Sequence, residues 1–220
     1  MKKIGGKSLI FPLRDNQQRR TITVTGTGDV QARPDFAQIQ IGVVTESLNA
    51  SEASRENASL MNRVIQSLVN LGIQRADIQT AQYNVFPKYD YVEGRQEFRG
   101  YEVTNSVSVK IRNIQDVSNV IDTAVSNGAN RVSQIEFKIE NVNGFVSRAL
   151  QLALQNAGEK AVAIAEKLRL SYMPVPIEIT EERLNEPILF REMAASRDIG
   201  TPIEPGIIEI RAELKVKYQY

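Results

Sequence analysis

Hydrophobic and polar residues alternate along several stretches of this chain, a pattern that predicts β-strands with one buried face. Residues 206–220 show it most clearly, because apolar side chains at every second position from Ile208 to Tyr218 alternate with charged ones. The same alternation runs through residues 37–43 and 100–112. Residues 83–91 carry several aromatic side chains together with Pro87, which favours an edge strand. We expect this strand to pair with residues 100–112 as a long antiparallel hairpin.

Helical periodicity is strongest in residues 143–170, where Asn143 is the expected N-cap. Alanine recurs there at every fourth position, at Ala149, Ala153, Ala157, Ala161 and Ala165. This spacing places the small side chains on one ridge, which a neighbouring element can approach closely. The ridge predicts either a helix packed on a sheet of its own chain or a helix shared between subunits. Two further helices are predicted at residues 49–71 and 113–127, each followed by a glycine.

The predicted order of elements is β-β-α-β-β-α-β-α-β-β. This order indicates an α+β fold with two lobes of mostly antiparallel sheet and helices packed on one face of each. We expect residues 21–91 and 206–220 to form one lobe and residues 97–205 to form the other. Residues 184–205 contain several prolines without periodicity, so a long surface loop is expected there. Residues 1–20 are expected to be a flexible polar tail.

Composition excludes many kinds of functional site. The 220 residues contain 27 Lys and Arg against 26 Asp and Glu, so the net charge of +1 gives no basic surplus for binding nucleic acid. The chain has no histidine and no cysteine. Imidazole bases, thiolate nucleophiles, disulfides and the usual zinc ligands are therefore ruled out. We expect no metal, no cofactor and no catalytic residues.

Two glycines near the N-terminus, Gly26 and Gly28, resemble the start of a phosphate-binding loop. The third glycine of such a loop is missing, since Gln31 stands in its place, and no helix follows. A β-bulge or a close approach of another backbone is the simpler interpretation.

Five carboxylates are candidates for an acid/base pair of the glycosidase type, which requires no histidine. They are Asp35, Glu46, Asp77, Glu136 and Glu140. Nothing in their spacing brings two of them together. We therefore expect them to be solvated residues at strand ends and helix caps, and the protein not to be an enzyme.

Aromatic residues are concentrated in and around the predicted hairpin. They are Tyr83, Phe86, Tyr89, Tyr91, Phe98 and Tyr101. Stacking on nucleic-acid bases is disfavoured because only Lys88, Arg95 and Arg99 lie among them. An edge hairpin that contacts another subunit explains them better, so these six residues are the candidates for self-association and a homo-oligomer is expected.

Several ordered segments together resemble the SIMPL domain family. They are the stretch ITVTGTGDVQARPDFAQIQIGV, residues 71–80, residues 99–105, residues 127–137 and the alanine-rich helix. The family is named for a mammalian member that associates with a signalling kinase. Its bacterial members are mostly envelope proteins, some of them forming ring-like or channel-like assemblies and some linked to oxidative stress. The resemblance implies no catalytic residues.

Two functional hypotheses follow from the sequence. The first is a non-enzymatic, self-assembling scaffold that binds partner proteins and has a stress-related role. The alternative is a small-ligand binder or carboxylate-based enzyme with a site between the lobes. Residues 1–20 lack a convincing signal peptide and no stretch is long enough to cross a membrane, which predicts a cytoplasmic protein; the cell envelope is the alternative that the resemblance implies.

Overall fold

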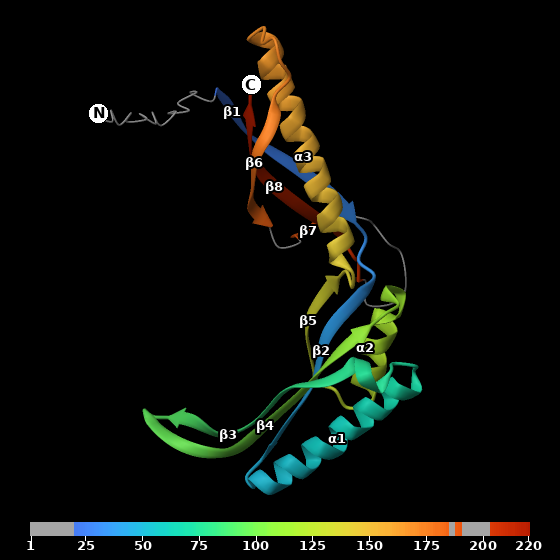
Figure 1. Cartoon of the computed structure of the whole chain (residues 1–220). Helices are drawn as coiled ribbons and strands as arrows, with labels where there is room; N and C mark the ends of the chain where they lie inside the picture. The colour runs from blue at the N-terminus through green and yellow to red at the C-terminus, as the bar shows by residue number, and fades with distance from the viewer. Residues whose placement is uncertain (1–19, 185–187, 191–202) are drawn as a thin grey trace, which may run out of the picture. The chain divides into compact units, whose positions relative to one another are not determined.

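The computed structural model describes residues 20–184, 188–190 and 203–220 (Figure 1). The elements are β1 (Thr21–Ala32), β2 (Phe36–Ser47), α1 (Ala50–Asn70), β3 (Ile78–Val92), β4 (Arg95–Ile111), α2 (Val117–Ser126), β5 (Arg131–Lys138), α3 (Val142–Lys167), β6 (Val175–Leu184), β7 (Ile188–Phe190) and β8 (Ile207–Gln219). This order confirms the predicted α+β class and adds the short strand β7 to it. Two sheets are formed, with the orders β1-β8-β6 and β3-β4-β2-β5, and β7 pairs with β8.

The chain divides into two compact units. Residues 20–28, 150–184 and 212–220 form what we call the α3 unit, and residues 29–149, 188–190 and 203–211 form the hairpin unit. This division differs from the expected one. Strands β3 and β4 pair from Ile78 opposite Val109 to Val92 opposite Arg95, so they belong to one unit. A boundary between residues 91 and 97 would cut through this hairpin.

In the α3 unit, the helix α3 packs on the sheet through its alanine ridge. Ala153, Ala157 and Ala161 have no exposed surface, and β8 presents buried apolar residues at alternate positions, as its sequence predicts. Ala149 and Ala165, at the two ends of the ridge, are buried as well. The ridge is therefore covered within its own chain, which excludes the interpretation that it is a face shared between subunits. The helix begins at Val142, so Asn143 lies in its first turn and is not the N-cap.

Gly26 of β1 explains why the ridge is built from alanine. A Cβ atom added to Gly26 would lie 2.0 Å from the backbone oxygen of Ala153 and 2.8 Å from the Cβ of Ala157. The backbones of β1 and α3 are thus close enough to exclude even a methyl group. Two hydrogen bonds hold them there, from the Thr27 amide to Asn156 Oδ1 at 3.2 Å and from Lys160 Nζ to the Thr25 oxygen at 2.7 Å. The prediction of a close backbone approach at this glycine is confirmed.

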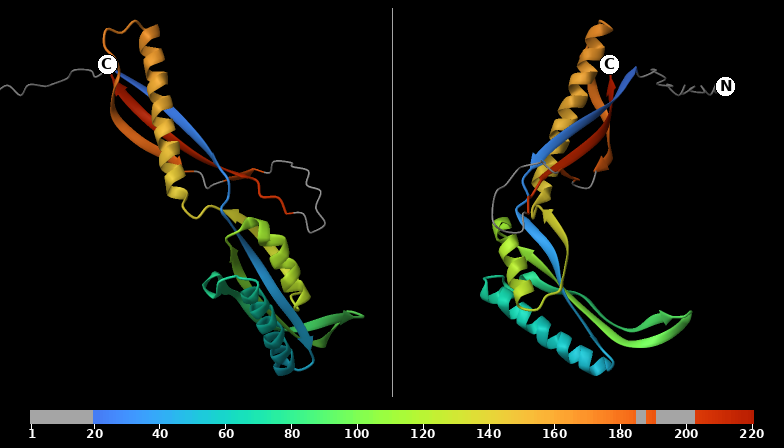
Figure 2. Two further views of the ribbon diagram at one scale, coloured as in Figure 1. Left: turned by 90° about the vertical axis from the view of Figure 1, so that its right-hand side faces the viewer. Right: turned by 180° about the vertical axis from the view of Figure 1, so that it is seen from behind.

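In the hairpin unit, α1 and α2 cover one face of the four-stranded sheet (Figure 2). The core between helices and sheet is aliphatic and consists mainly of Ile39, Ile41, Val43, Val64, Leu68, Val107, Val109, Ile111, Val117 and Val120. The buried residues of α2 are Val117, Val120, Ile121 and Ala124. Asn49 caps α1 by accepting a hydrogen bond from the Ser51 amide, and Gly72 follows the helix with φ +105°.

Two predictions concern residues that the structure describes only in part. The flexible tail at residues 1–20 lies outside the described residues except for Arg20. The predicted surface loop at 184–205 is described only at its ends and at β7, which is a strand and therefore corrects the expectation of a continuous loop. The sequence did not indicate β7 because three apolar residues in a row have no strand periodicity.

Candidate functional site

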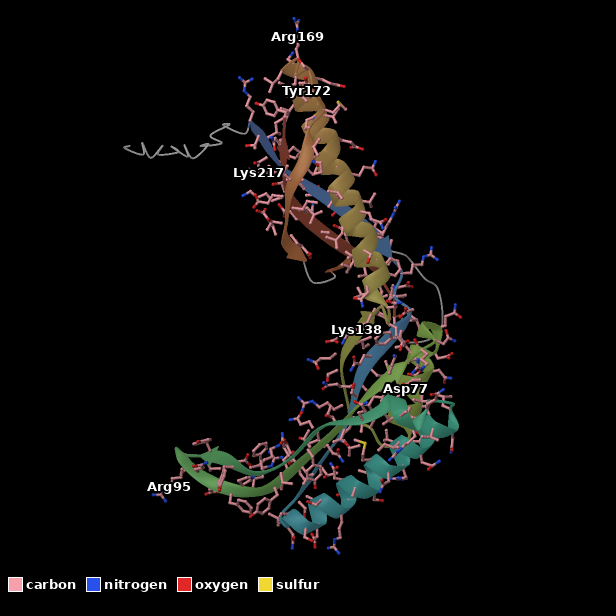
Figure 3. The ribbon with its side chains drawn as sticks, viewed as in Figure 1. Asp77, Arg95, Lys138, Arg169, Tyr172 and Lys217 are labelled. Carbon is pink, nitrogen blue, oxygen red and sulfur yellow. The ribbon has the colours of Figure 1, made fainter. Side chains whose placement is uncertain are left out.

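The six aromatic residues predicted for self-association lie on the hairpin of β3 and β4. We call residues 83–101 the aromatic hairpin. The last pair between β2 and β4 is Ser47 opposite Tyr101, and β3 lies at the edge of the sheet. Beyond Tyr101 the aromatic hairpin is consequently a two-stranded ribbon, which extends past α1 and α2 to a tip marked by Arg95 (Figure 3).

The strand register places five of the six aromatic rings on one face of the aromatic hairpin. Residues directly opposite each other in an antiparallel pair share a face, and Pro87 lies opposite Tyr101 while Tyr89 lies opposite Phe98. Tyr83 and Tyr91 lie on the same face as Pro87 and Tyr89, because side chains alternate along β3. The register shift between Lys88 and Tyr89 leaves this alternation intact, since its extra residue lies in β4. Phe86, opposite Glu102, points to the other face.

These rings are exposed in the described chain although they are large and apolar. Tyr91 is 76% exposed, Phe86 58% and Tyr83 53%, and Tyr101 is half-buried. Tyr89, Phe98 and Tyr101 pack edge to face in a row, with ring centroids 5.8 Å and 5.3 Å apart. The face is therefore a preformed aromatic surface that no described part of its own unit covers.

Charged residues fix the base of the aromatic hairpin on the side opposite this row. Lys88 Nζ lies 2.5 Å from Glu46 Oε1 and 2.9 Å from Glu102 Oε2, which joins β3 to β2 and β4. The hydrogen bond from Lys88 lowers the pKa of Glu46, and the bonds to Glu46 and Glu102 raise the pKa of Lys88. Arg99 extends the network to Asp90, at 3.5 Å.

The pairing of β3 with β4 is irregular next to Lys88. Lys88 lies opposite Gly100 and the next residue, Tyr89, lies opposite Phe98, so Arg99 is an extra residue in β4 and forms a β-bulge. Gly100 adopts φ +146°, and a Cβ there would lie 2.8 Å from the Ser47 oxygen. The bulge and the glycine together allow β4 to pass the end of β2 and continue as a free ribbon.

The structure brings together carboxylates that the sequence did not. Arg112 contacts both Asp77 and Glu140: its guanidinium donates two 3.0 Å hydrogen bonds to the Asp77 carboxylate and lies 3.5 Å from Glu140 Oε2. Asp35 accepts a hydrogen bond from the Glu140 amide, and Lys110 contacts Glu140 at 2.7 Å. The spacing of these residues in the sequence gave no sign of this cluster.

This carboxylate cluster is an ion-pair network and lacks the features of a general acid. The hydrogen bond from Lys110 lowers the pKa of Glu140, whereas a general acid at neutral pH needs a raised one. The pKa of Arg112 is raised by Asp77. Glu46 is tied to Lys88 in the separate network at the base of the aromatic hairpin, and Glu136 contacts Lys138 at 2.6 Å. Lys110 and Arg112 accordingly stabilise the ionised form of Glu140.

Among the residues that the structure describes, no group of three or more Asp, Glu, His or Cys side chains could hold a metal ion. No helix in the described ranges has the length and apolar character needed to span a membrane.

A second surface of the hairpin unit was not predicted from the sequence. The sheet face that α1 and α2 leave uncovered carries a polar hollow of about 290 Å³, lined by Gln40, Gly42, Gln82, Thr104, Ser106, Arg131, Ser133 and Gln134. The sequence does contain a pattern that indicates a polar sheet face, since Thr104, Ser106 and Ser108 are the polar half of the alternation in β4. Such a pattern is ordinarily taken as a solvated face, and four separate strands must pair before the hollow exists.

Comparisons with known proteins agree with the resemblance. Residues 22–218 match the family described as SIMPL, protein of unknown function (DUF541). The 26 kDa periplasmic immunogenic protein of Brucella melitensis is 28% identical to the chain over 98% of its length and 92% of the relative's. The uncharacterized protein YggE of Escherichia coli is 26% identical over 70% of this chain and 63% of its own. Since the match extends over nearly the whole sequence, the chain belongs to the SIMPL family.

Proposed function

We propose that this protein is a non-enzymatic scaffold of the bacterial cell envelope that self-associates through the aromatic hairpin. The observation that supports this most is the row of Tyr89, Phe98 and Tyr101, which continues as exposed aromatic surface on a ribbon that no described residue of its own unit covers. Large aromatic side chains are enriched at the centres of protein interfaces. An isolated two-stranded hairpin is also only marginally stable in water, so contact with another copy would stabilise it.

The edges of the ribbon provide a second means of association. Beyond Tyr101, β4 no longer pairs with β2, and β3 is an edge strand along its whole length. Unpaired strand edges offer backbone donors and acceptors to another strand. Pro87 lacks an amide hydrogen and interrupts the edge of β3, whereas β4 has no proline between Arg95 and Tyr101. The β4 edge is therefore the better one for pairing with a second copy.

The envelope placement is supported by the relatives. The Brucella protein is described as periplasmic, and the chain matches 92% of its length. This replaces the cytoplasmic expectation as our preferred location. No described residue bears on a stress-related role, which stays a prediction from the family resemblance.

Light scattering on a sizing column tests the proposal. The wild-type protein should elute with a mass that is a multiple of the 24.6 kDa chain at micromolar concentration. Replacing Phe86 and Tyr89 with serine should yield smaller species, because one ring is removed from each face of the ribbon. Circular dichroism should be unchanged, since both side chains lie outside the core.

Tyr172 and Met173 provide a matched control. They are 80% and 65% exposed and lie in the α3 unit, so replacing both with serine removes as much exposed apolar surface away from the aromatic hairpin. That variant should keep the wild-type mass. A wild-type mass near 24.6 kDa, or equal loss of mass in both double variants, would contradict self-association through the aromatic hairpin.

A further inference from the structure

The polar hollow on the sheet of the hairpin unit is formed where a side chain is missing from the middle of the sheet. Gly42 of β2 lies directly opposite Ser106 of β4 on one side and Arg131 of β5 on the other. A Cβ at Gly42 would lie 3.4 Å from the Arg131 Cβ and 3.5 Å from the Ser106 Cβ. The glycine therefore leaves a floor between the two neighbours, and longer side chains on the flanking strands form the walls.

A buried hydroxyl in this floor has no partner among the described residues. Ser106 is 6% exposed and its Oγ atom makes no hydrogen bond to any of them, although serine hydroxyls both donate and accept. Thr104, the next residue on the same face, is 7% exposed. Buried polar groups are nearly always hydrogen-bonded, so an unpaired hydroxyl at the bottom of a hollow indicates a ligand that supplies the missing bond.

Strained backbone borders the same hollow. Gln134 has φ +52°, in the left-handed region that residues with a side chain seldom occupy. It lies where the pairing of β5 with β2 shifts register, because Gln38 is opposite Glu136 while Gln40 is opposite Ser133. This β-bulge turns Gln134 into the lining of the hollow. Strain of this kind is concentrated at binding sites.

The chemistry of the lining selects the ligand. Its side chains include three amides, from Gln40, Gln82 and Gln134, and three hydroxyls, from Thr104, Ser106 and Ser133. Each of these groups can donate and accept hydrogen bonds, which matches the hydroxyls of a sugar ring. Arg131 is the one charged residue among the eight that line the hollow, and a guanidinium binds a carboxylate with two parallel hydrogen bonds.

We propose that this hollow binds an acidic sugar unit, with Arg131 holding the sugar carboxylate and the hydroxyl of Ser106 and the surrounding glutamine amides holding its ring hydroxyls. A phosphate ion could use Arg131 but would leave most of the amides and hydroxyls without partners. A neutral sugar could use the amides but would leave Arg131 unpaired. The proposal is independent of self-association, since all eight lining residues lie within one unit of one chain.

Isothermal titration calorimetry of the full chain with trigalacturonate tests the inference. Trigalacturonate should bind saturably, and maltotriose and inorganic phosphate should each bind at least about tenfold more weakly. Arg131→Gln should weaken trigalacturonate binding by about tenfold or more, because a charge-assisted pair is lost. Ser106→Ala should weaken it by about three- to tenfold.

Ser108→Ala is the matched control for Ser106→Ala. Ser108 lies two residues along the same strand on the same face, outside the lining, and its hydroxyl accepts a hydrogen bond from Gln38 at 2.8 Å. Its replacement should change the affinity for trigalacturonate by less than about twofold. The unfolding midpoint of Ser106→Ala should not fall, because the lost hydroxyl had no partner, so weaker binding in this variant would not reflect loss of the fold.

Three results would overturn the assignment. One is the absence of saturable trigalacturonate binding. Another is binding of phosphate or maltotriose as tight as that of trigalacturonate. The third is equal weakening by Ser106→Ala and Ser108→Ala, which would place the ligand elsewhere on the sheet.

Discussion

The alanine ridge of α3 and the aromatic hairpin are both apolar, but only the ridge is covered. Ala153, Ala157 and Ala161 have no exposed surface, whereas Phe86 and Tyr91 are more than half exposed. Small side chains let α3 approach β1 until their backbones nearly touch. Large rings on a two-stranded ribbon have no second layer to pack against. We therefore expect the buried ridge to contribute to folding stability and the exposed aromatic hairpin to contribute to association.

The largest loss of stability is expected for Gly26→Ala. Its new Cβ would lie 2.0 Å from a backbone oxygen, so β1 and α3 would have to separate and the ridge would lose its contact. The free energy of unfolding should fall by about 3 kcal/mol, the upper end of the usual range for overpacking. Urea unfolding measures this.

Gly144→Ala is the control for that change. Gly144 lies in α3 with nothing within 4 Å of the added Cβ, so the protein should be stabilised by about 0.5–1 kcal/mol. Similar effects of the two substitutions would mean that the tight approach at Gly26 is absent in solution.

A somewhat smaller effect is expected for Ala157→Leu, which should cost about 1–3 kcal/mol. Ala157 has no exposed surface, so the leucine side chain can be accommodated only by moving the helix. Ala163→Leu places the same side chain on an exposed position of α3 and should change the stability by less than about 0.5 kcal/mol. Thermal unfolding of the two variants measures this difference. An unchanged midpoint for Ala157→Leu would mean that Ala157 lies on an uncovered surface.

Tyr91→Ser should leave the stability of the single chain almost unchanged. The ring is 76% exposed, and the expected change is within about 0.5 kcal/mol despite the loss of a large side chain. Urea unfolding at a concentration where the protein is monomeric gives this value. A loss as large as that for Ala157→Leu would show that the aromatic hairpin is folded onto its own chain.

The smallest effect concerns the charges at the base of the aromatic hairpin. The pKa of Glu46 is lowered from its ordinary value of 4.5, chiefly by the hydrogen bond from Lys88. The stabilisation from this pair is therefore complete above pH 4.5 and is lost as the pH falls through the lower pKa of the folded state. In a carbon NMR titration, Lys88→Met should raise the midpoint of Glu46. An identical midpoint in both proteins would mean that the pair does not persist in solution.

Most of the secondary structure could be predicted from local pattern. Alternation identified β2, β4 and β8, and Asn49 and the glycines after α1 and α2 located three of the helix ends within a residue or two. The start of α2 was predicted too early, because Asn113 caps a short 3-10 helix at Ile114–Asp116 and α2 itself begins at Val117. These signals work because each depends on neighbours a few residues apart. The division into units could not be predicted in the same way, since it depends on which strands pair.

The candidate sites were predictable to different degrees. The aromatic hairpin could be located from its residues alone, because two adjacent strands and their turn contain the whole row. The cluster of Asp77, Arg112 and Glu140 could not, because its members come from segments 35 and 28 residues apart that meet only in the folded unit. The polar hollow depends on the register of four strands, which no local pattern encodes.

By itself, the sequence determined most of the strands, the helices, the alanine ridge and the family, because periodicity and turn residues act over short distances. The tertiary structure alone decided that Gly26 is the residue against which the ridge packs, that Arg112 joins two distant carboxylates, and that Gly42 leaves Ser106 at the floor of a hollow. Each of these depends on a distance of a few ångströms between residues far apart in the chain. Such distances are fixed by strand pairing and by the packing of helices on sheets.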